Sequence, residues 1–146
     1  DRSPSRGLGD VYKRQSQYNV GAQTRRTDNM EWHSEDVLEI HPHDAEYRGI
    51  DHGDMLQVSS RAGDTMLRAD ITERVQPGVV YTTFHHPETG ANVVTTDNSD
   101  WATNCPEYKV TAVEVRKMSG QSDWQSSYEK FSQQQVAFLQ EAETQA

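Results

Sequence analysis

The sequence is short of cysteine, of basic residues and of long apolar runs, and each shortage excludes a class of protein. Its single cysteine, Cys105, cannot form an intrachain disulfide and cannot by itself build a zinc or iron–sulfur site. The 14 Lys and Arg residues face 23 Asp and Glu residues, and the formal net charge of −9 disfavours nucleic acid or an anionic membrane as a general partner. No apolar run reaches membrane-spanning length and no secretory signal is recognisable, so we expect a cytoplasmic protein without membrane insertion.

The sequence also lacks the short motifs that mark self-contained active sites. It contains no HExxH, P-loop, GxGxxG or serine-nucleophile motif. Its six histidines include His41 and His43 and the pair His85 and His86, but no carboxylate or cysteine stands at a recognised zinc spacing from them. We therefore predict no metal ligands and no catalytic residues in this chain.

What is present divides the 146 residues into three parts. Residues 1–15 are polar and have no helix or strand period, so we interpret them as a disordered or non-native leader resembling translated linker sequence, and we expect the natural chain to extend upstream of Ser16. Residues 16–118 form the predicted domain. In residues 119–146, apolar side chains recur at helical intervals, which predicts an amphipathic helical tail packing on that domain or on the rest of a larger protein. Docking onto a separate protein is the alternative.

Within the domain, turn residues separate short strand-like segments. Pro42 can open a helix and Gly49 can end it in the left-handed conformation. The strand-like segments are 55–60 and 65–71, which form a predicted hairpin, then 79–84 and 108–115. Short strands spaced by Gly and Pro favour a small β-barrel. The long connection before the last strand, rich in Asn, Asp and Thr, indicates a functional loop.

Four segments in a fixed order carry a family resemblance. They are YNVGAQTRRT (18–27), the run from IHPHDAEYRGI to YTTFHH (40–86), GANVVTTDNSD (90–100) and PEYKVTAVEV (106–115). Together they resemble the C-terminal molybdopterin-dinucleotide-binding domain of oxidoreductases related to dimethyl sulfoxide reductase, and within that family the formate dehydrogenase α subunit. The resemblance implies a mainly β fold, a double-psi β-barrel of about six strands with short helices and a C-terminal amphipathic helix.

The resemblance also implies a function for the larger protein. It implies a bis-molybdopterin guanine dinucleotide cofactor with Mo or W, formate as the substrate oxidised to carbon dioxide, and iron–sulfur clusters only in an upstream part. The expected partners are the rest of the catalytic subunit and electron-transfer subunits. The ligating Cys or selenocysteine belongs upstream and Cys105 stands in the wrong motif, so the isolated fragment is expected to be inactive.

Two groups of residues could contact the cofactor. In 18–27, a glycine allows close backbone approach, and Thr24, Arg25 and Arg26 suit phosphate oxygens; an exposed basic turn is the alternative. The amide of Asn92 can donate and accept together, as a pteridine edge requires, and Lys109 offers three donors. Without the resemblance, Asn92 is a turn former and Lys109 a solvent-facing strand residue.

The resemblance extends these two groups to a full set of cofactor-binding residues. Phe84 is placed toward the substrate cavity; without the resemblance it is a core residue at the end of a strand. The predicted cofactor contacts are Tyr18, Asn19, Gly21, Thr24, Arg25, Arg26, His85, Asn92, Tyr108 and Lys109.

Three alternatives remain open from the sequence. The same domain could belong to a nitrate reductase-like enzyme, which would share the fold and cofactor. It could be a stand-alone cofactor-binding subunit, as in formylmethanofuran dehydrogenase. It could also be a small barrel that only packs against partners and binds no cofactor.

Overall fold

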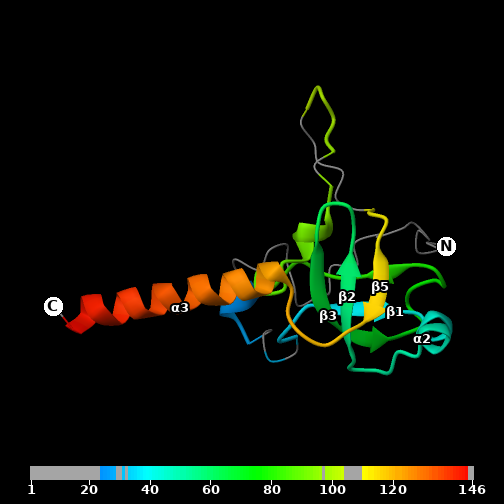
Figure 1. Ribbon diagram of the computed structural model, residues 1–146, viewed down its shortest axis with the longest axis horizontal. Coiled ribbons are helices and arrows are strands. Elements are labelled where there is room, and N and C mark those ends of the chain that lie inside the picture. Colours follow the sequence, from blue (N-terminus) through cyan, green and yellow to red (C-terminus); the bar gives the residue numbers. More distant parts are fainter. Residues whose placement is uncertain (1–23, 29–30, 32, 97, 104–109, 145–146) are drawn as a thin grey trace.

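The computed structural model describes residues 24–28, 31, 33–96, 98–103 and 110–144, with the elements shown in Figure 1. In chain order these elements are η1 (Thr24–Arg26), β1 (Val37–Ile40), α2 (Pro42–Arg48), β2 (Met55–Ser59), β3 (Asp64–Ile71), β4 (Val80–Tyr81), η2 (Ala91–Val94), β5 (Glu114–Lys117) and α3 (Asp123–Thr144). The leader assigned to residues 1–15 lies outside the described residues.

The strands of the described chain form one mainly antiparallel sheet with the order β4-β1-β3-β2-β5. The exception is one pair, in which β1 runs parallel to β3, with Val37 beside Arg68 and Ile40 beside Ile71. The connection between this parallel pair contains α2 and β2, so the chain leaves the sheet and returns. The sheet is curled in Figure 1, in the manner of an open barrel.

The core lies on one face of the curled sheet. Alternation in β2 buries Leu56 and Val58 while Met55, Gln57 and Ser59 remain half-buried. The other buried apolar residues of this cluster come from β1, α2 and the turn after it, β3, η2 and β5, and they are Leu38, Ile40, Ala45, Ile50, Leu67, Ala69, Val94 and Val115. The core is therefore assembled from strands far apart in sequence.

The helix expected between Pro42 and Gly49 is present as α2, with proline at its start and glycine at its end as predicted. The side chain of His41 caps its start by accepting a hydrogen bond from the His43 N–H at 3.1 Å, and Pro42 occupies the first turn. Gly49 ends the helix at φ +64°, a conformation that residues with a Cβ avoid. The predicted hairpin is likewise present as β2 and β3.

Two predicted strands have different limits. The strand expected over 79–84 is reduced to Val80–Tyr81, because the residues that follow donate hydrogen bonds to the Asp36 side chain and not to a neighbouring strand. In the segment predicted as a strand over 108–115, residues 110–113 are not in a strand, and β5 begins only at Glu114. The reason is the length of its neighbour: β2 offers backbone partners only from Leu56, opposite Lys117, to Ser59, opposite Glu114.

The predicted tail helix forms α3, which starts against the sheet and then extends away from it (Figure 1). Its first turn is closed by a reciprocal capping box: the Gln125 N–H donates to the Ser122 hydroxyl at 3.2 Å, and the Ser122 N–H donates to the Gln125 side-chain oxygen at 2.9 Å. None of the described helices is both long and apolar enough to cross a membrane.

Candidate functional site

The segment after β4 is organised around one buried carboxylate, Asp36. Asp36 directly precedes β1 and is 1% exposed. It accepts hydrogen bonds from the backbone N–H groups of His85 at 3.2 Å and His86 at 2.8 Å, and from the hydroxyls of Thr83 and Thr89. A buried carboxylate is stable only when such donors replace water. Asp36 therefore holds the predicted site loop, residues 83–89, against the start of β1.

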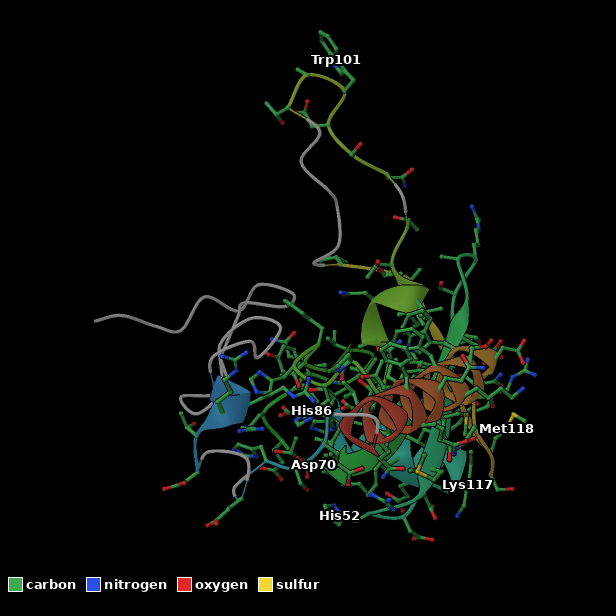
Figure 2. The ribbon with its side chains drawn as sticks, turned by 90° about the vertical axis from the view of Figure 1, so that its left-hand side faces the viewer. His52, Asp70, His86, Trp101, Lys117 and Met118 are labelled. Carbon is green, nitrogen blue, oxygen red and sulfur yellow. The ribbon has the colours of Figure 1, made fainter. Side chains whose placement is uncertain are left out.

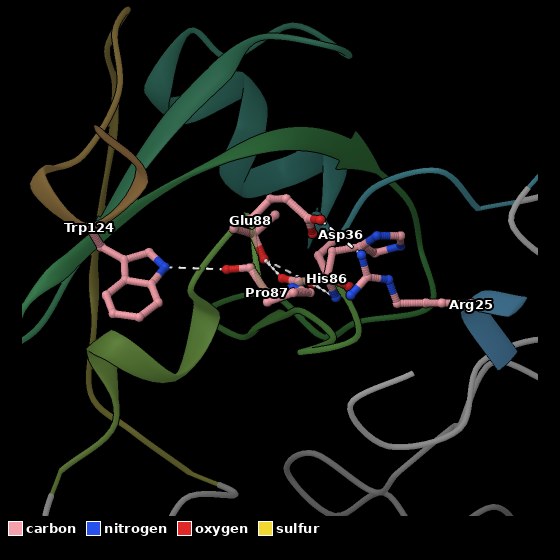
Figure 3. A network of polar contacts seen from close by, with 7 residues as sticks. Arg25, Asp36, His86, Pro87, Glu88 and Trp124 are labelled. Atoms are coloured by element: carbon pink, nitrogen blue, oxygen red, sulfur yellow. Dashed lines mark hydrogen bonds and ion pairs between the residues drawn. The ribbon is translucent and has the colours of Figure 1, made fainter. Parts of the chain in front are cut away.

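His86 lies inside this network (Figure 3). The residue is 4% exposed, and its ring stands edge-to-face with that of His85 at 5.1 Å between centroids. Its backbone N–H is bound to Asp36, but its imidazole Nε2 is buried and has no hydrogen-bond partner among the described residues. A buried polar atom without a partner costs about 1–3 kcal/mol, so this nitrogen marks a position where a ligand atom would be stabilising.

Arg25 joins the N-terminal segment to the same loop. Its Nη2 donates to the Glu88 carboxylate at 2.8 Å, across 63 positions of sequence. The Arg25 side chain is 30% exposed, yet its Nε is buried and has no hydrogen-bond partner among the described residues. Two buried nitrogens without partners thus belong to one network (Figure 3). The Arg25 Nε–H is suited to an anionic or carbonyl oxygen, and the His86 Nε2 is suited to one when it carries the ring proton.

The far end of the loop is covered by α3. Gly90 begins η2 at φ +60°, and the Trp124 indole lies directly over it. The indole Nε1 donates to the Pro87 carbonyl at 3.3 Å (Figure 3). In η2 the side chain of Asn92 is exposed, while its carbonyl accepts from the Thr95 N–H at 3.1 Å. Asn92 therefore presents its amide to the outside of the loop that Trp124 fastens.

The structure places only part of the predicted site. It brings Arg25 to the loop that carries half-buried Phe84 and buried His85, while Arg26 and Asn92 are exposed. Of Thr24 only the backbone, in η1, is described. The residues Tyr18, Asn19, Gly21, Tyr108 and Lys109 lie outside the described residues, so their cofactor contacts remain predictions.

Sequence reasoning missed Asp36, which has the most hydrogen bonds to the loop, and it did not assign His86. Asp36 stands in a polar stretch, SED, just before the apolar run of β1, where a carboxylate is ordinarily solvent-exposed. Only its partners, about 50 positions further along the chain, reveal its role. Among the described residues, no three His, Cys, Asp or Glu side chains are grouped closely enough to hold a metal ion.

The pKa shifts found among the described residues belong to groups outside the loop 83–89. The Lys117 ammonium donates to Asp54 at 2.6 Å, and this hydrogen bond lowers the pKa of Asp54 and raises the pKa of Lys117. Figure 2 shows Lys117 well apart from His86. Backbone N–H groups of Ala102 and Thr103 lower the pKa of Asp100, in the turn where Trp101 is 96% exposed. These ionic groups serve local structure.

Comparison with known proteins gives this arrangement a context. The chain is 41% identical over 102 residues to the F420-dependent formate dehydrogenase 1 subunit alpha of Methanococcus maripaludis, covering 69% of this chain and 15% of that protein. It is 35% identical over 80 residues to the periplasmic nitrate reductase of Desulfovibrio desulfuricans, covering 55% of this chain and 11% of that protein. The chain thus spans about 15% of the length of the formate dehydrogenase subunit.

A solved structure shares the fold. Acetylene hydratase from Pelobacter acetylenicus superposes with a TM-score of 0.57 over 68% of this chain and 16% of its own, at 16% sequence identity. At that identity the likeness concerns the fold alone. The model of the Molydopterin dinucleotide binding domain matches residues 11–112, which include the whole sheet up to β4 together with the Asp36 network. The chain therefore belongs to the Molydopterin dinucleotide binding domain family.

Proposed function

We propose that this chain is the C-terminal cofactor-binding domain of a molybdenum or tungsten formate dehydrogenase catalytic subunit, with the barrel at 16–118 and a helical tail at 119–146. The supporting observation is the 41% identity over 102 residues to a formate dehydrogenase alpha subunit. The likeness to a nitrate reductase is weaker and shorter, 35% over 80 residues, so formate is the favoured substrate of the larger protein.

The described loop fits an anionic dinucleotide cofactor. The Nε of Arg25 and the Nε2 of His86 are buried without a partner among the described residues. A phosphate or pterin oxygen would accept from the Arg25 Nε–H, and it would accept from His86 when the ring proton is on Nε2. When bound, the cofactor supplies the metal-centred redox chemistry that oxidises formate. The residues of this chain bind and orient it, and Asp36 keeps the loop in place for that contact.

The individual roles come from the family resemblance, and the chemistry of the side chains is consistent with them. Thr24, Arg25 and Arg26, with the segment of Tyr18, Asn19 and Gly21, bind phosphate groups; Asn92, Tyr108, Lys109 and His85 contact the pterin, and Phe84 borders the substrate cavity. None of these side chains ligates the metal or transfers a proton. Iron–sulfur clusters, electron-transfer subunits and formate itself belong with the rest of a cytoplasmic enzyme.

We further propose that the curled sheet belongs to a double-psi β-barrel of about six strands. The parallel pairing of β1 with β3 across a connection that contains α2 and β2 supports this topology. The fold likeness to acetylene hydratase supports the barrel but does not distinguish its strand order.

The deciding experiment uses the full-length catalytic subunit, of which we propose that this chain is the C-terminal domain. Purified enzyme should contain Mo or W and reduce an artificial electron acceptor with formate. If the enzyme carries the metal, reduces nitrate and does not oxidise formate, the nitrate reductase-like alternative is correct and the formate dehydrogenase proposal is wrong. A full-length protein without any pterin cofactor would overturn the binding function as well.

A further inference from the structure

The backbone around His86 is held at two places, one on either side of the residue. On one side, the Asp36 carboxylate accepts from the His86 N–H at 2.8 Å. On the other side, the Pro87 carbonyl accepts from the Trp124 indole at 3.3 Å and from the Gly90 N–H at 3.1 Å (Figure 3). Pro87 has no N–H, so its carbonyl is the only backbone group through which it can be hydrogen-bonded. His86 therefore lies between one fixed point beside β1 and a second on α3.

Contacts within the chain keep Trp124 itself in place. The Ser122–Gln125 capping box sets the start of α3. The Gln125 side chain donates to the Met66 carbonyl of β3 at 2.8 Å, and Tyr128 stacks on the Trp124 indole at 6.3 Å between ring centroids. The first turn of α3 cannot move along β3 without breaking these contacts. The indole is thus a rigid point of support for the loop.

Trp124 acts on the loop more than on the core. Its side chain is 43% exposed, and no residue of α3 belongs to the buried apolar cluster of the described chain. The two residues that it contacts, Pro87 and Gly90, lie between two candidate cofactor contacts, His86 before them and Asn92 after them. A change at Trp124 should therefore disturb the loop while the core remains folded.

We propose that Trp124 is a positioning residue for the cofactor, acting through Pro87 on the ring of His86. This inference rests on the proposed function. The His86 ring is 4% exposed and stands edge-to-face with that of His85, so it has little room to rotate when its backbone shifts. The direction of its Nε2 depends on where Pro87 is held. Because α3 lies beyond residue 112, this control comes from outside the part of the chain that the family model matches.

The first test measures amide hydrogen exchange, resolved by residue, in the 146-residue chain. Trp124→Ala should speed exchange of the His86 N–H at least about tenfold, because loss of the support at Pro87 opens the loop on both sides. The Ala69 N–H, which donates to the Asp54 carbonyl at 2.8 Å, is the internal reference and should change by less than about twofold. No change at His86, or an equal change at both amides, overturns the proposal.

Two further variants separate the contact at the loop from a general effect of α3. Trp124→Phe keeps a ring over Gly90 and removes the N–H donor, so it should restore part of the protection that Trp124→Ala loses at the His86 N–H. Phe131→Ala removes a 56% exposed aromatic further along the same helix and should exchange like wild type. If Phe131→Ala acts as strongly as Trp124→Ala, the helix acts as a whole and the proposal is wrong.

The second test follows release of the bound Mo or W from the full-length catalytic subunit, measured by mass spectrometry after repeated gel filtration. Trp124→Ala should lose the metal at least about tenfold faster than wild type or Phe131→Ala, while turnover of formate per bound metal stays near that of wild type. Equal rates of release overturn the proposal and leave the proposed function standing. A wild-type subunit that holds no pterin cofactor overturns the proposed function, and this inference with it.

Discussion

At the scale of single residues, the site loop depends on one carboxylate. Asp36 is buried and accepts four hydrogen bonds from residues 83–89 through both of its oxygens. Two of the donors are backbone N–H groups, so the loop conformation itself, and not only side-chain placement, depends on this residue. His86 next to it has its backbone satisfied and its Nε2 without a partner among the described residues.

Replacing Asp36 by Asn should destabilise the chain. The amide keeps the size of the side chain but offers one acceptor oxygen in place of two, so at least one buried donor loses its partner. We expect unfolding to be easier by about 1–3 kcal/mol. Urea denaturation followed by circular dichroism measures this, with the exposed Glu73→Gln as the control that should stay within about 0.5 kcal/mol of wild type. Equal stability of Asp36→Asn and wild type would contradict the role of Asp36 in holding residues 83–89.

The substitution His86→Phe should separate stability from cofactor binding. A phenyl ring keeps the contact with His85 and removes the buried nitrogen that has no described partner, so the isolated chain should be as stable as wild type or more stable. In the full-length subunit the same change should lower the Mo or W content, measured by mass spectrometry. Unchanged metal content would remove His86 from the proposed binding site.

At the scale of elements, the first turn of α3 fastens the loop between β4 and η2 to the sheet. The Ser122 and Gln125 capping box orients the helix, and Trp124 packs over Gly90. A Cβ on Gly90 would lie 1.9 Å from Cδ1 of Trp124, which no real contact allows. Glycine is therefore needed at this position for its left-handed φ and for the space it leaves.

The variant Gly90→Ala should detach Trp124. Left-handed strain and the clash together predict a loss of about 2–4 kcal/mol in the free energy of unfolding and a change in tryptophan fluorescence. Gly78→Ala is the matched control: Gly78 also has positive φ, at +80°, but an added Cβ meets nothing within 4 Å. If both variants lose the same stability, backbone strain alone explains the effect and the packing argument is wrong.

The ion pair between β5 and the turn before β2 predicts a pH dependence. Lys117 holds the pKa of Asp54 below its ordinary value of 3.8, so the pair stabilises the fold fully above about pH 4 and this contribution is lost as the pH falls through the lowered pKa. Asp54 raises the pKa of Lys117 above 10.5, so the contribution is also lost at high pH, as the pH rises through that raised pKa. Between these limits both groups are charged.

Lys117→Met should therefore lower the urea midpoint at neutral pH, and its difference from wild type should shrink toward about pH 2. The exposed Lys130→Met on α3 is the control and should show no such pH-dependent difference. A Lys117→Met effect that is the same at both pH values would mean that packing of the lysine stem, and not the charge pair, stabilises β5.

At the scale of the whole molecule, the proposed role is to hold a cofactor whose metal is ligated elsewhere. Asn92 and Lys109 are expected to contact the pterin, one from an exposed position in η2 and the other outside the described residues. Because neither is assigned to proton transfer or metal ligation, their loss should affect retention of the cofactor and not the chemistry of enzyme that still holds it.

Asn92→Ala and Lys109→Ala in the full-length subunit should accordingly lower Mo or W content, since each removes a directed hydrogen bond worth about 1–3 kcal/mol. Turnover of formate per bound metal should stay near that of wild type. Cys105→Ala is the control and should keep both values, because Cys105 is assigned no ligand role. Normal metal content with turnover per metal about a thousandfold lower would show that this domain supplies a catalytic group.

The sequence by itself determined the elements whose signals are local. Pro42 and Gly49 limit α2, the alternation over 55–60 and 65–71 defines the hairpin, and the helical spacing in the tail predicts α3, all of which the structure confirms. Four ordered motifs were also enough to indicate the family, which the family match confirms. These features depend on residues that are neighbours along the chain, and so their patterns are legible without tertiary information.

Only the tertiary structure decided which distant segments meet. The limits of β5 depend on the length of β2, and the role of Asp36 depends on donors about 50 positions further along. Arg25 reaches Glu88 across 63 positions, and Trp124 of α3 packs on Gly90 and donates to the Pro87 carbonyl, more than 30 positions earlier in the chain. No local pattern encodes these pairings, because each forms only after chain folding has brought its partners together and its free energy depends on the burial created there.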